Sequence, residues 1–263
     1  MDLGLKGKLV LVSASTGGIG YAIAKLLTQE GAHVIINGRS KERVKVAIDQ
    51  LKKDNVKGEL LSAPYDLSKK EGVDANIKEF PKVDILVNNL GIYETKNFAD
   101  ITDEDWLKIF VVNVLSGTRL SRHYFPLMLK NNWGRIVFIS SESAINIPGE
   151  MIHYGMTKTA QISVARGLAG LTKGTNVTVN SVLPGPTYSE GVQDFIESIA
   201  KERKTSSKQV EQDFFKSMRP SSLLQRFETT DEIASLVAYV CSERASGTNG
   251  AALRVEGGVI QSI

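Results

Sequence analysis

Short apolar runs alternate with longer amphipathic stretches along the whole chain. The apolar runs predict strands at residues 8–13, 33–37, 59–63, 83–88, 136–140, 177–183 and 252–255. The amphipathic stretches predict helices at residues 18–30, 41–53, 102–130, 152–171 and 230–241, and a further segment at 69–79 separates two of the apolar runs. Thr102 is expected to cap the longest helix, because acids fill the next three positions.

This alternation predicts a fold class. Strands that are apolar on both faces and joined by helices are typical of a parallel sheet covered on both sides. Right-handed crossovers then give a Rossmann-type, doubly wound α/β fold of about seven strands, with ligands at the carboxyl ends of the strands. Residues 189–226 interrupt the alternation with a polar segment, which predicts one or two small helices over the sheet edge. No repeat or linker divides the chain, so residues 1–263 are expected to form one domain.

Composition and charge exclude several classes of protein. The net charge is only +3, and both signs are interspersed, which argues against a nucleic-acid or membrane surface. No apolar stretch approaches the roughly 18–20 residues that span a bilayer. Residues 1–8 lack the apolar core of a signal peptide, so a cytoplasmic protein is expected. The one cysteine, Cys241, has no internal partner and is expected to be buried and inert.

A glycine-rich turn follows the first predicted strand. Residues 13–20 read Ser-Ala-Ser-Thr-Gly-Gly-Ile-Gly and lead directly into a helix. Glycines let the backbone approach a pyrophosphate, which binds at the positive N-terminus of the helix. A tight turn without a ligand is the alternative, but the position after the first strand of a long strand-helix series favours a dinucleotide site.

The end of the second strand bears on the choice of dinucleotide. An acid there favours NAD, whereas an arginine accommodates the 2′-phosphate of NADP. Residues 37–41 contain no acid but two cations, Arg39 and Lys41. Guanidinium pairs well with phosphate, so we expect a preference for NADP(H) with Arg39 as its main determinant and NAD(H) as a possible substitute. The alternative is a solvated cation at a helix start.

A tyrosine and a lysine lie four residues apart in the helix predicted at 152–171. Tyr154 and Lys158 therefore share one face. A cation close to the phenol is expected to lower its pKa from about 10, so that the pair acts as an acid in ketone reduction or a base in alcohol oxidation. Thirteen residues upstream of Tyr154, Ser141 follows a predicted buried strand. Its hydroxyl is placed to bind a substrate oxygen, although a turn residue that ends the strand is the alternative.

The order of these motifs resembles the short-chain dehydrogenase/reductase family along essentially the whole chain. The matching segments are residues 13–20, Asn88-Asn89-Leu90-Gly91, Asn113, Ser141, Tyr154 with Lys158, Pro184-Gly185 and Glu256-Gly257-Gly258. The resemblance implies that Tyr154 exchanges the proton and that Lys158 binds the nicotinamide ribose. It also implies that Ser141 orients the substrate and that Asn113 holds a water linking Lys158 to solvent, with a helix-capping role as the alternative for Asn113.

The resemblance further implies a cofactor site made from strand ends and the turns after them. Its expected members are Ser13, Ser15, Thr16, Gly18, Ile19, Gly20, Arg39, Ser40, Asp66, Leu67, Asn89, Gly91, Tyr154, Lys158, Pro184, Gly185, Thr187 and Ser189. Asp66 is expected at the adenine, with turn formation as its alternative. The chain also departs from the family pattern: Ala14 replaces a glycine, Leu90 replaces an alanine, and Gly17 stands where many NADP-dependent relatives carry a basic residue.

The expected function is NADP(H)-dependent hydride transfer to or from a small carbonyl or alcohol, without a metal. A 3-oxoacyl thioester or another ketone is one substrate class, and a sugar, polyol or steroid is another. A dinucleotide-binding regulator without turnover, and an isomerase or dehydratase on the same scaffold, stay open as well. Residues 189–226 are expected to cap the substrate. The candidate residues of the pocket wall are Ile145, Ile147, Met151, Tyr188, Phe195, Phe214 and Phe215. The alternative is that these side chains pack against the protein itself. The resemblance also suggests a homotetramer, or a homodimer, formed through the helices at 102–130 and 152–171 and the last strand.

Overall fold

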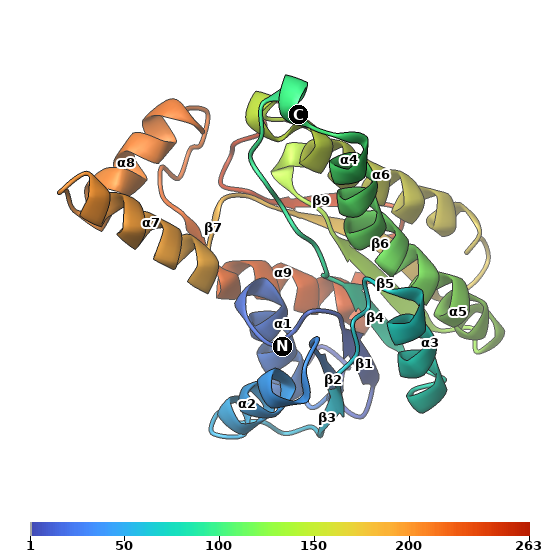
Figure 1. Ribbon diagram of the computed structural model, residues 1–263. Coiled ribbons are helices and arrows are strands. Elements are labelled where there is room, and N and C mark those ends of the chain that lie inside the picture. The colour runs from blue at the N-terminus through green and yellow to red at the C-terminus, as the bar shows by residue number, and fades with distance from the viewer. Residues whose placement is uncertain (1) are drawn as a thin grey trace.

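A computed structural model describes residues 2–263 and arranges them around a parallel sheet (Figure 1). Within these residues, seven strands pair in the order β3-β2-β1-β4-β5-β6-β9, every pair parallel. The strands are β1 (Leu9–Val12), β2 (His33–Asn37), β3 (Leu60–Ala63), β4 (Ile85–Asn88), β5 (Gly134–Ile139), β6 (Val177–Pro184) and β9 (Ala252–Val255). The predicted doubly wound α/β fold is confirmed.

Helices cover both faces of the sheet. They are α1 (Gly18–Gln29), α2 (Lys41–Leu51), α3 (Lys70–Glu79), α4 (Asp103–Phe110), α5 (Ser116–Lys130), α6 (Ile152–Gly170), α7 (Glu190–Glu202), α8 (Ser207–Ser217) and α9 (Thr230–Cys241). Two short strands, β7 (Thr187–Tyr188) and β8 (Glu228–Thr229), pair at the base of α7 and α8. Among residues 2–263 none of the helices has the length and apolar character needed to cross a membrane.

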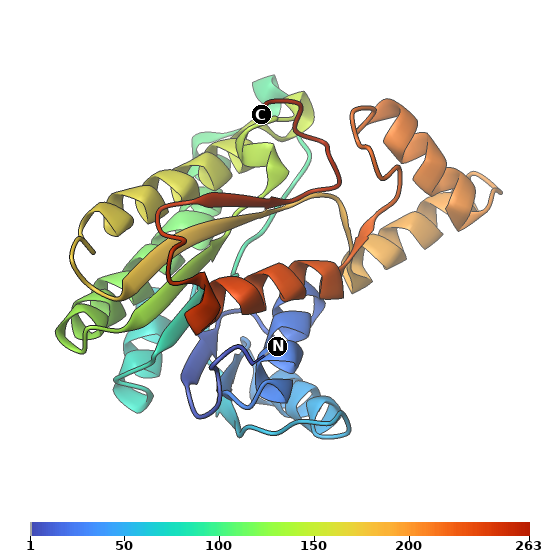
Figure 2. The ribbon, with the colours of Figure 1, turned by 180° about the vertical axis from the view of Figure 1, so that it is seen from behind.

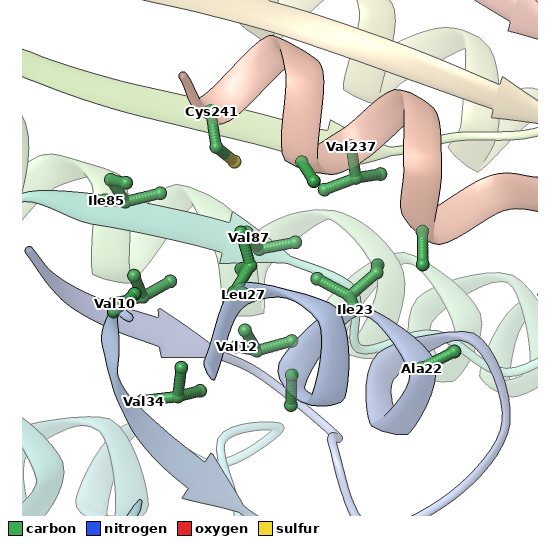
Figure 3. Close-up of a cluster of buried hydrophobic side chains, with 14 of the residues drawn as sticks. Val10, Val12, Ala22, Ile23, Leu27, Val34, Ile85, Val87, Val237 and Cys241 are labelled. Carbon is green, nitrogen blue, oxygen red and sulfur yellow. The ribbon is translucent and has the colours of Figure 1, made fainter. Parts of the chain in front are cut away.

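Two apolar clusters hold the layers together, because successive residues of each strand point to opposite faces. In β1, Val10 and Val12 join the cluster under α1, α2 and α9, whereas Leu11 joins the cluster under α3, α5 and α6. Figure 3 shows the first cluster, with Cys241 of α9 inside it. Cys241 is buried, as predicted, and burial raises the pKa of its thiol to about 12.

The strand order reverses at a topological switch point between β1 and β4. The chain builds outward from β1 to β3, then returns to the other side of β1 at β4. The turns that follow β1 and β4 therefore leave the sheet in opposite directions, and ligands of such folds bind between them. The glycine turn follows β1, and the segment Asn89-Leu90-Gly91 follows β4.

The helix predicted at residues 102–130 is divided into three parts. Thr102 caps α4 as expected: its hydroxyl accepts the amide of Asp105 at 3.3 Å, and Asp105 accepts the amide of Thr102 at 3.0 Å. A π-helical turn, Val111–Leu115, then separates α4 from α5. Such turns are often found at functional sites, and this one contains Asn113.

The helices α7 and α8 project from the sheet as a cap (Figures 1 and 2). The cap has an apolar core of its own, in which Phe215 is 1% exposed and Phe214 stacks on Phe227 with ring centres 5.0 Å apart. The expectation that Phe215 lines a substrate pocket is therefore wrong, because the small cap needs its side chain for packing. Ile147 and Tyr188, in contrast, are exposed.

Candidate active site

Tyr154 and Lys158 lie on the same side of α6, next to the carboxyl end of β5. The hydroxyl of Ser140 donates to the Lys158 carbonyl at 2.9 Å and so ties α6 to the strand end. The Nζ atom of Lys158 lies 5.5 Å from the centre of the Tyr154 ring. The spacing of four residues thus brings the phenol and the ammonium together, as the sequence predicts.

A glutamine joins Lys158 to Asn113. The Lys158 ammonium donates to the carbonyl of Ile139 at 2.9 Å and to Oε1 of Gln161 at 3.3 Å. Nε2 of Gln161 donates in turn to the Asn113 carbonyl at 2.6 Å. Gln161 therefore spans the gap for which the family resemblance implies a water. Sequence reasoning missed it, although its position three residues after Lys158 puts it on the same helix face.

The Asn113 side chain makes three hydrogen bonds that join the segment after β4 to α6. Its Oδ1 accepts the amide of Ile92 at 2.8 Å, and its Nδ2 donates to the Ile92 carbonyl at 2.9 Å and to the Thr157 hydroxyl at 3.0 Å. Asn113 thereby holds the segment after β4 against α6. Gly91 lies next to Lys158, because a Cβ built on Gly91 would be 3.4 Å from Nζ.

The pKa values of the two residues shift in opposite directions. Burial lowers the pKa of Lys158 to about 8, and the charge of Glu142 opposes this shift. Burial, followed by the charge of Glu142, raises the pKa of Tyr154, while a polar contact with Ser141 and the charge of Arg219 act in the other direction. The predicted lowering of the Tyr154 pKa is wrong for this structure, since burial and the charge of Glu142 outweigh the Ser141 contact and the charge of Arg219.

The Ser141 hydroxyl is bound to an acid. It donates to Oε2 of Glu142 at 2.5 Å and accepts the amide of Ser143 at 3.1 Å. Oε1 of Glu142 accepts from Nε of Arg219 at 3.0 Å. Sequence reasoning missed both charged residues. An acid directly after a buried strand was a usable signal for Glu142, whereas no local pattern marks Arg219, which is 77 positions further along the chain.

The serines of the glycine turn point inward. The Ser13 hydroxyl donates to the Val87 carbonyl at 3.3 Å and accepts the amides of Asn89 and Leu90 at 2.8 and 2.9 Å. The Ser15 hydroxyl donates to a carbonyl of β1 and accepts the amide of Asn37. Both residues are buried, and their amides donate to the carbonyls of Val87 and Asn37, so the structure does not place Ser13 and Ser15 in contact with a cofactor as the family resemblance implies.

The turn itself is closely packed. Ala14, at the place of the family's first glycine, adopts φ +52°, a conformation that costs an alanine about 1–2 kcal/mol. Its carbonyl accepts from Nδ2 of Asn89 at 3.1 Å. A Cβ on Gly20 would stand 2.4 Å from the Ala14 carbonyl oxygen and 2.5 Å from Asn89 Nδ2. Glycine is therefore required at position 20.

The N-terminus of α1 is open to an anion. Gly17 precedes the helix without a side-chain cap, and the first turn, which contains Gly18 and Ile19, has no acid. The amides of such a first turn have no partner inside the helix. One carboxylate lies nearby, since a Cβ on Gly17 would be 3.3 Å from Oε2 of Glu190 at the start of α7.

The end of β2 adjoins this turn. The Asn37 side chain accepts the Ala14 amide at 3.0 Å, and Gly38 packs so closely on Thr16 that a Cβ would meet the threonine methyl at 2.6 Å. Arg39 is exposed beyond this contact. Ser40 caps α2 by accepting the amide of residue 43 at 3.3 Å.

The side chains of Asp66 and Leu67 are used within the protein and not for the cofactor contacts that the family resemblance implies. Oδ1 of Asp66 accepts both the amide and the hydroxyl of Ser68, at 3.1 and 2.6 Å, which is the turn-forming role named as the alternative. Leu67 is 1% exposed and packs in the second apolar cluster. The structure therefore does not place Leu67 in contact with a cofactor, as the family resemblance implies.

The segment after Pro184 is held by an acid from β8. The Gly185 amide donates to the Val255 carbonyl and to Oε2 of Glu228, each at 3.0 Å. The Thr187 hydroxyl donates to the Gly185 carbonyl at 2.9 Å. Burial raises the pKa of Glu228 to about 7. Ser189, at the end of this segment, reaches the glycine turn: a Cβ on Gly18 would be 3.6 Å from the Ser189 Cβ.

The fold and this cluster define an oxidoreductase of the dinucleotide-binding type, and comparison with known proteins agrees. A family model described as enoyl-(acyl carrier protein) reductase matches residues 13–260. The chain is 50% identical to an uncharacterised oxidoreductase, YvrD, of Bacillus subtilis, over 100% of both chains. It is 34% identical to 3-oxoacyl-(acyl-carrier-protein) reductase of Aquifex aeolicus, over 98% of this chain and 100% of the relative.

Solved structures give the same result. The crystal structure of L-sorbose reductase from Gluconobacter frateurii, complexed with NADPH and L-sorbose, matches with a TM-score of 0.94 at 29% identity, over 100% of both chains. The chain belongs to the short-chain dehydrogenase/reductase family of oxidoreductases.

Proposed function

We propose that this protein transfers a hydride between NADP(H) and a carbonyl or alcohol substrate. The observation that carries the proposal is the cluster of Tyr154, Lys158 and Ser141 at the end of β5, the strand that follows the switch point between β1 and β4. A proton donor, a cation and a hydroxyl are the groups that carbonyl reduction needs.

The residues around this switch point fit a dinucleotide. The first turn of α1 offers free amides, without a side-chain cap or an acid, to a pyrophosphate. The exposed Arg39, with no acid at residues 37–41, supports the 2′-phosphate of NADP over the bare ribose of NAD. The related L-sorbose reductase was solved with NADPH.

Each polar residue of the cluster has a separate role in this proposal. When bound, NADPH would supply the hydride that reduces the substrate carbonyl carbon. Tyr154 gives its phenolic proton to the carbonyl oxygen, and Ser141 donates a hydrogen bond to that oxygen. Lys158 stabilises the resulting phenolate with its positive charge. Gln161 and the Asn113 carbonyl hold Lys158 in place through the hydrogen bonds described above.

Replacing the proton donor tests the reaction. Tyr154→Phe keeps the ring but removes the proton, so we expect NADPH affinity within about twofold of the parent and turnover lower by about 10²–10⁴. Binding is read by NADPH fluorescence and turnover by loss of NADPH absorbance. The substrate panel contains ketoses, simple ketones and 3-oxoacyl thioesters, since the relatives' names include both a ketose reductase and a 3-oxoacyl reductase. Unchanged turnover would remove Tyr154 from the mechanism and with it this proposal.

A second variant tests the cofactor. Arg39→Ala removes the cation beside the expected 2′-phosphate, so the Kd for NADPH should rise by about 10- to 100-fold while that for NADH stays constant. A charge-assisted hydrogen bond is worth about 1.5–3 kcal/mol, which sets this magnitude. Equal changes for both dinucleotides would contradict the assignment of Arg39.

We also propose a cytoplasmic homotetramer, with a homodimer as the smaller alternative. Support comes from family membership and from Leu107 and Leu171, which are 65% and 67% exposed on α4 and at the end of α6. Multi-angle light scattering of the purified protein tests the proposal, and a monomer at micromolar concentration would refute it.

A further inference from the structure

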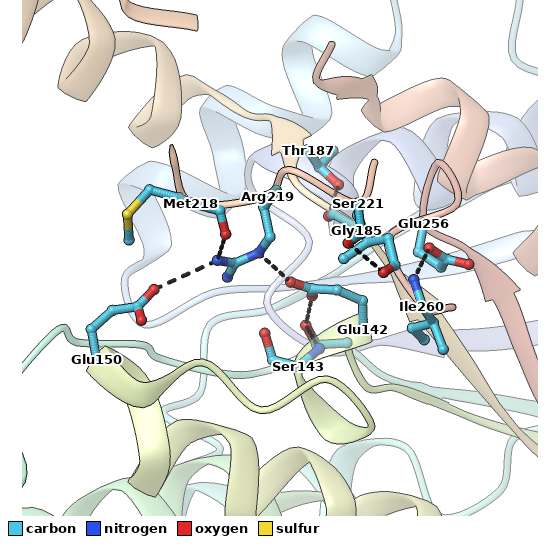
Figure 4. A network of polar contacts seen from close by, with 12 residues as sticks. Glu142, Ser143, Glu150, Gly185, Thr187, Met218, Arg219, Ser221, Glu256 and Ile260 are labelled. Carbon is cyan, nitrogen blue, oxygen red and sulfur yellow. Dashed lines mark hydrogen bonds and ion pairs between the residues drawn. The ribbon is translucent and has the colours of Figure 1, made fainter. Parts of the chain in front are cut away.

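A buried ion pair lies directly against the reactive residues. Glu142 and Arg219 are 4% and 8% exposed, and Nε of Arg219 donates to Oε1 of Glu142 at 3.0 Å. Figure 4 shows Arg219 between Glu142 and Glu150, with its Nη1 bound to the Met218 carbonyl. Glu142 follows Ser141 in sequence, whereas Arg219 comes from the end of the cap.

The charges of Glu142 and Arg219 act on the proton donor, Tyr154. The charge of Glu142 raises the pKa values of both Tyr154 and Lys158, and the charge of Arg219 lowers that of Tyr154. The wall next to the reacting groups is therefore ionic. Burying two charges carries a desolvation cost that close packing with apolar side chains would avoid. A hydrocarbon chain of a substrate has no hydrogen-bond donor to offer to the Glu142 carboxylate at this wall.

The hydrogen bond from Ser141 to Glu142 competes with a hydrogen bond from Ser141 to a substrate. A serine hydroxyl has a single proton, and Ser141 donates it to Oε2 of Glu142 at 2.5 Å. When Ser141 turns this proton to a substrate carbonyl, Oε2 of Glu142 loses its donor. A buried carboxylate oxygen without a donor is costly, so productive binding needs a replacement.

The substrate itself can supply that donor. A hydroxyl on the carbon next to the carbonyl carries a proton and lies close to the carbonyl oxygen, just as Oε2 of Glu142 lies close to Oγ of Ser141. The two pairs can exchange partners: Ser141 donates to the carbonyl oxygen, and the substrate hydroxyl donates to Glu142. Arg219 stays bound to Oε1 throughout.

We propose that Glu142 is a substrate-recognition residue and that the substrate is an α-hydroxy ketone, reduced to a vicinal diol. This inference rests on the proposed function. The hydride adds to the carbonyl carbon, the C=O π pair takes the Tyr154 proton at oxygen, and NADPH becomes NADP⁺. The neighbouring hydroxyl keeps its own proton and serves recognition only.

Matched substrates test the inference on the intact enzyme. The probes are 1-hydroxy-2-butanone, 2-butanone and a 3-oxobutanoyl thioester, and the readout is kcat/KM from NADPH absorbance. We expect at least a 100-fold preference for the hydroxy ketone, because a site built around a hydrogen bond rejects the analogue without it. In Glu142→Gln, this preference should fall by at least tenfold.

A second Glu–Arg pair provides the control. Glu232, in the first turn of α9, pairs with Arg226 at the exposed surface, and Glu232→Gln should leave the preference unchanged. Equal or better reduction of 2-butanone or of the thioester by the parent enzyme would overturn the inference and leave the proposed function standing. Lack of turnover with every carbonyl and with both NADPH and NADH would instead overturn the proposed function. Should Glu142→Gln fail to fold, the preference of the parent enzyme decides the question alone.

Discussion

The close packing of the glycine turn predicts that a single methyl group added at Gly20 destabilises the protein. Gly20→Ala and Gly167→Ala both add a Cβ inside a helix, a change worth about 1 kcal/mol of helix propensity. Nothing lies within 4 Å of the new Cβ at Gly167 in α6. At Gly20 the new Cβ would stand 2.4 Å from the Ala14 carbonyl oxygen and 2.5 Å from Asn89 Nδ2, two atoms that are hydrogen-bonded to each other.

The overlap decides the sign of the change in stability. Overpacking costs about 1–3 kcal/mol, and the 2.4 Å approach to a backbone oxygen puts Gly20→Ala in the upper part of that range. After the gain in helix propensity, the net loss of stability should be about 1–2 kcal/mol. For a chain of this size that corresponds to a fall in Tm of about 2–8 °C, whereas Gly167→Ala should raise Tm by about 2–4 °C. Differential scanning calorimetry measures both values.

The same overlap should weaken cofactor binding. To admit the methyl group, the Ala14 peptide and Asn89 must move apart, which opens the turn at the N-terminus of α1. We expect the Kd for NADPH to rise at least tenfold in Gly20→Ala and to stay constant in Gly167→Ala, as read by fluorescence titration. If Gly20→Ala were as stable as the parent and bound NADPH equally well, contact with Ala14 and Asn89 would not be the reason for glycine at this position.

Three further predictions follow from single side chains. Gln161→Leu removes an acceptor of the Lys158 ammonium, which should lower the Lys158 pKa further below about 8 and shift the alkaline fall of kcat to lower pH; a change in KM alone would contradict this positioning role. Because the folded pKa of Glu228 is about 7 and the unfolded value near 4.5, the folded state binds the extra proton, so Tm should fall as pH rises from 4.5 to 7. Glu228→Gln cannot lose this proton and should show a smaller fall, whereas parallel Tm curves would refute the assignment. Glu190→Gln removes a negative charge from the N-terminus of α1 and should tighten NADPH about two- to fivefold; the charge is worth about 0.3–1 kcal/mol there, and an unchanged Kd would exclude the effect.

Local patterns in the sequence were enough to predict the sheet and part of the candidate site. Apolar runs marked the strands because a parallel sheet covered by helices buries both faces of each strand. The acids after Thr102 marked the start of α4, and the spacing of Tyr154 and Lys158 placed them on one face of α6. Each of these features depends on residues at most a few positions apart, which is the range over which sequence periodicity carries information.

Features that depend on tertiary contacts were not predictable in this way. The π-helical turn at Asn113 lies inside a continuous helical pattern, and nothing in the spacing of apolar residues marks it. Ser13 has the residue type of a phosphate ligand, yet its hydroxyl joins β1 to the segment after β4. The burial that raises the pKa of Tyr154 comes from the surrounding fold, so a rule based on Lys158 alone gave the wrong direction.

The charges around Tyr154 come from three distant parts of the chain and balance one another. Lys158 belongs to α6, Glu142 follows β5, and Arg219 comes from the end of the cap. Because Arg219 is the residue that pairs with Oε1 of Glu142, the carboxylate is compensated only while the cap is docked on the sheet. Without Arg219, the Glu142 carboxylate would lose its ion-pair partner, and the Tyr154 phenol would lose a positive charge that lowers its pKa. The acidity of the proton donor therefore depends in part on a charge that comes from the end of the cap.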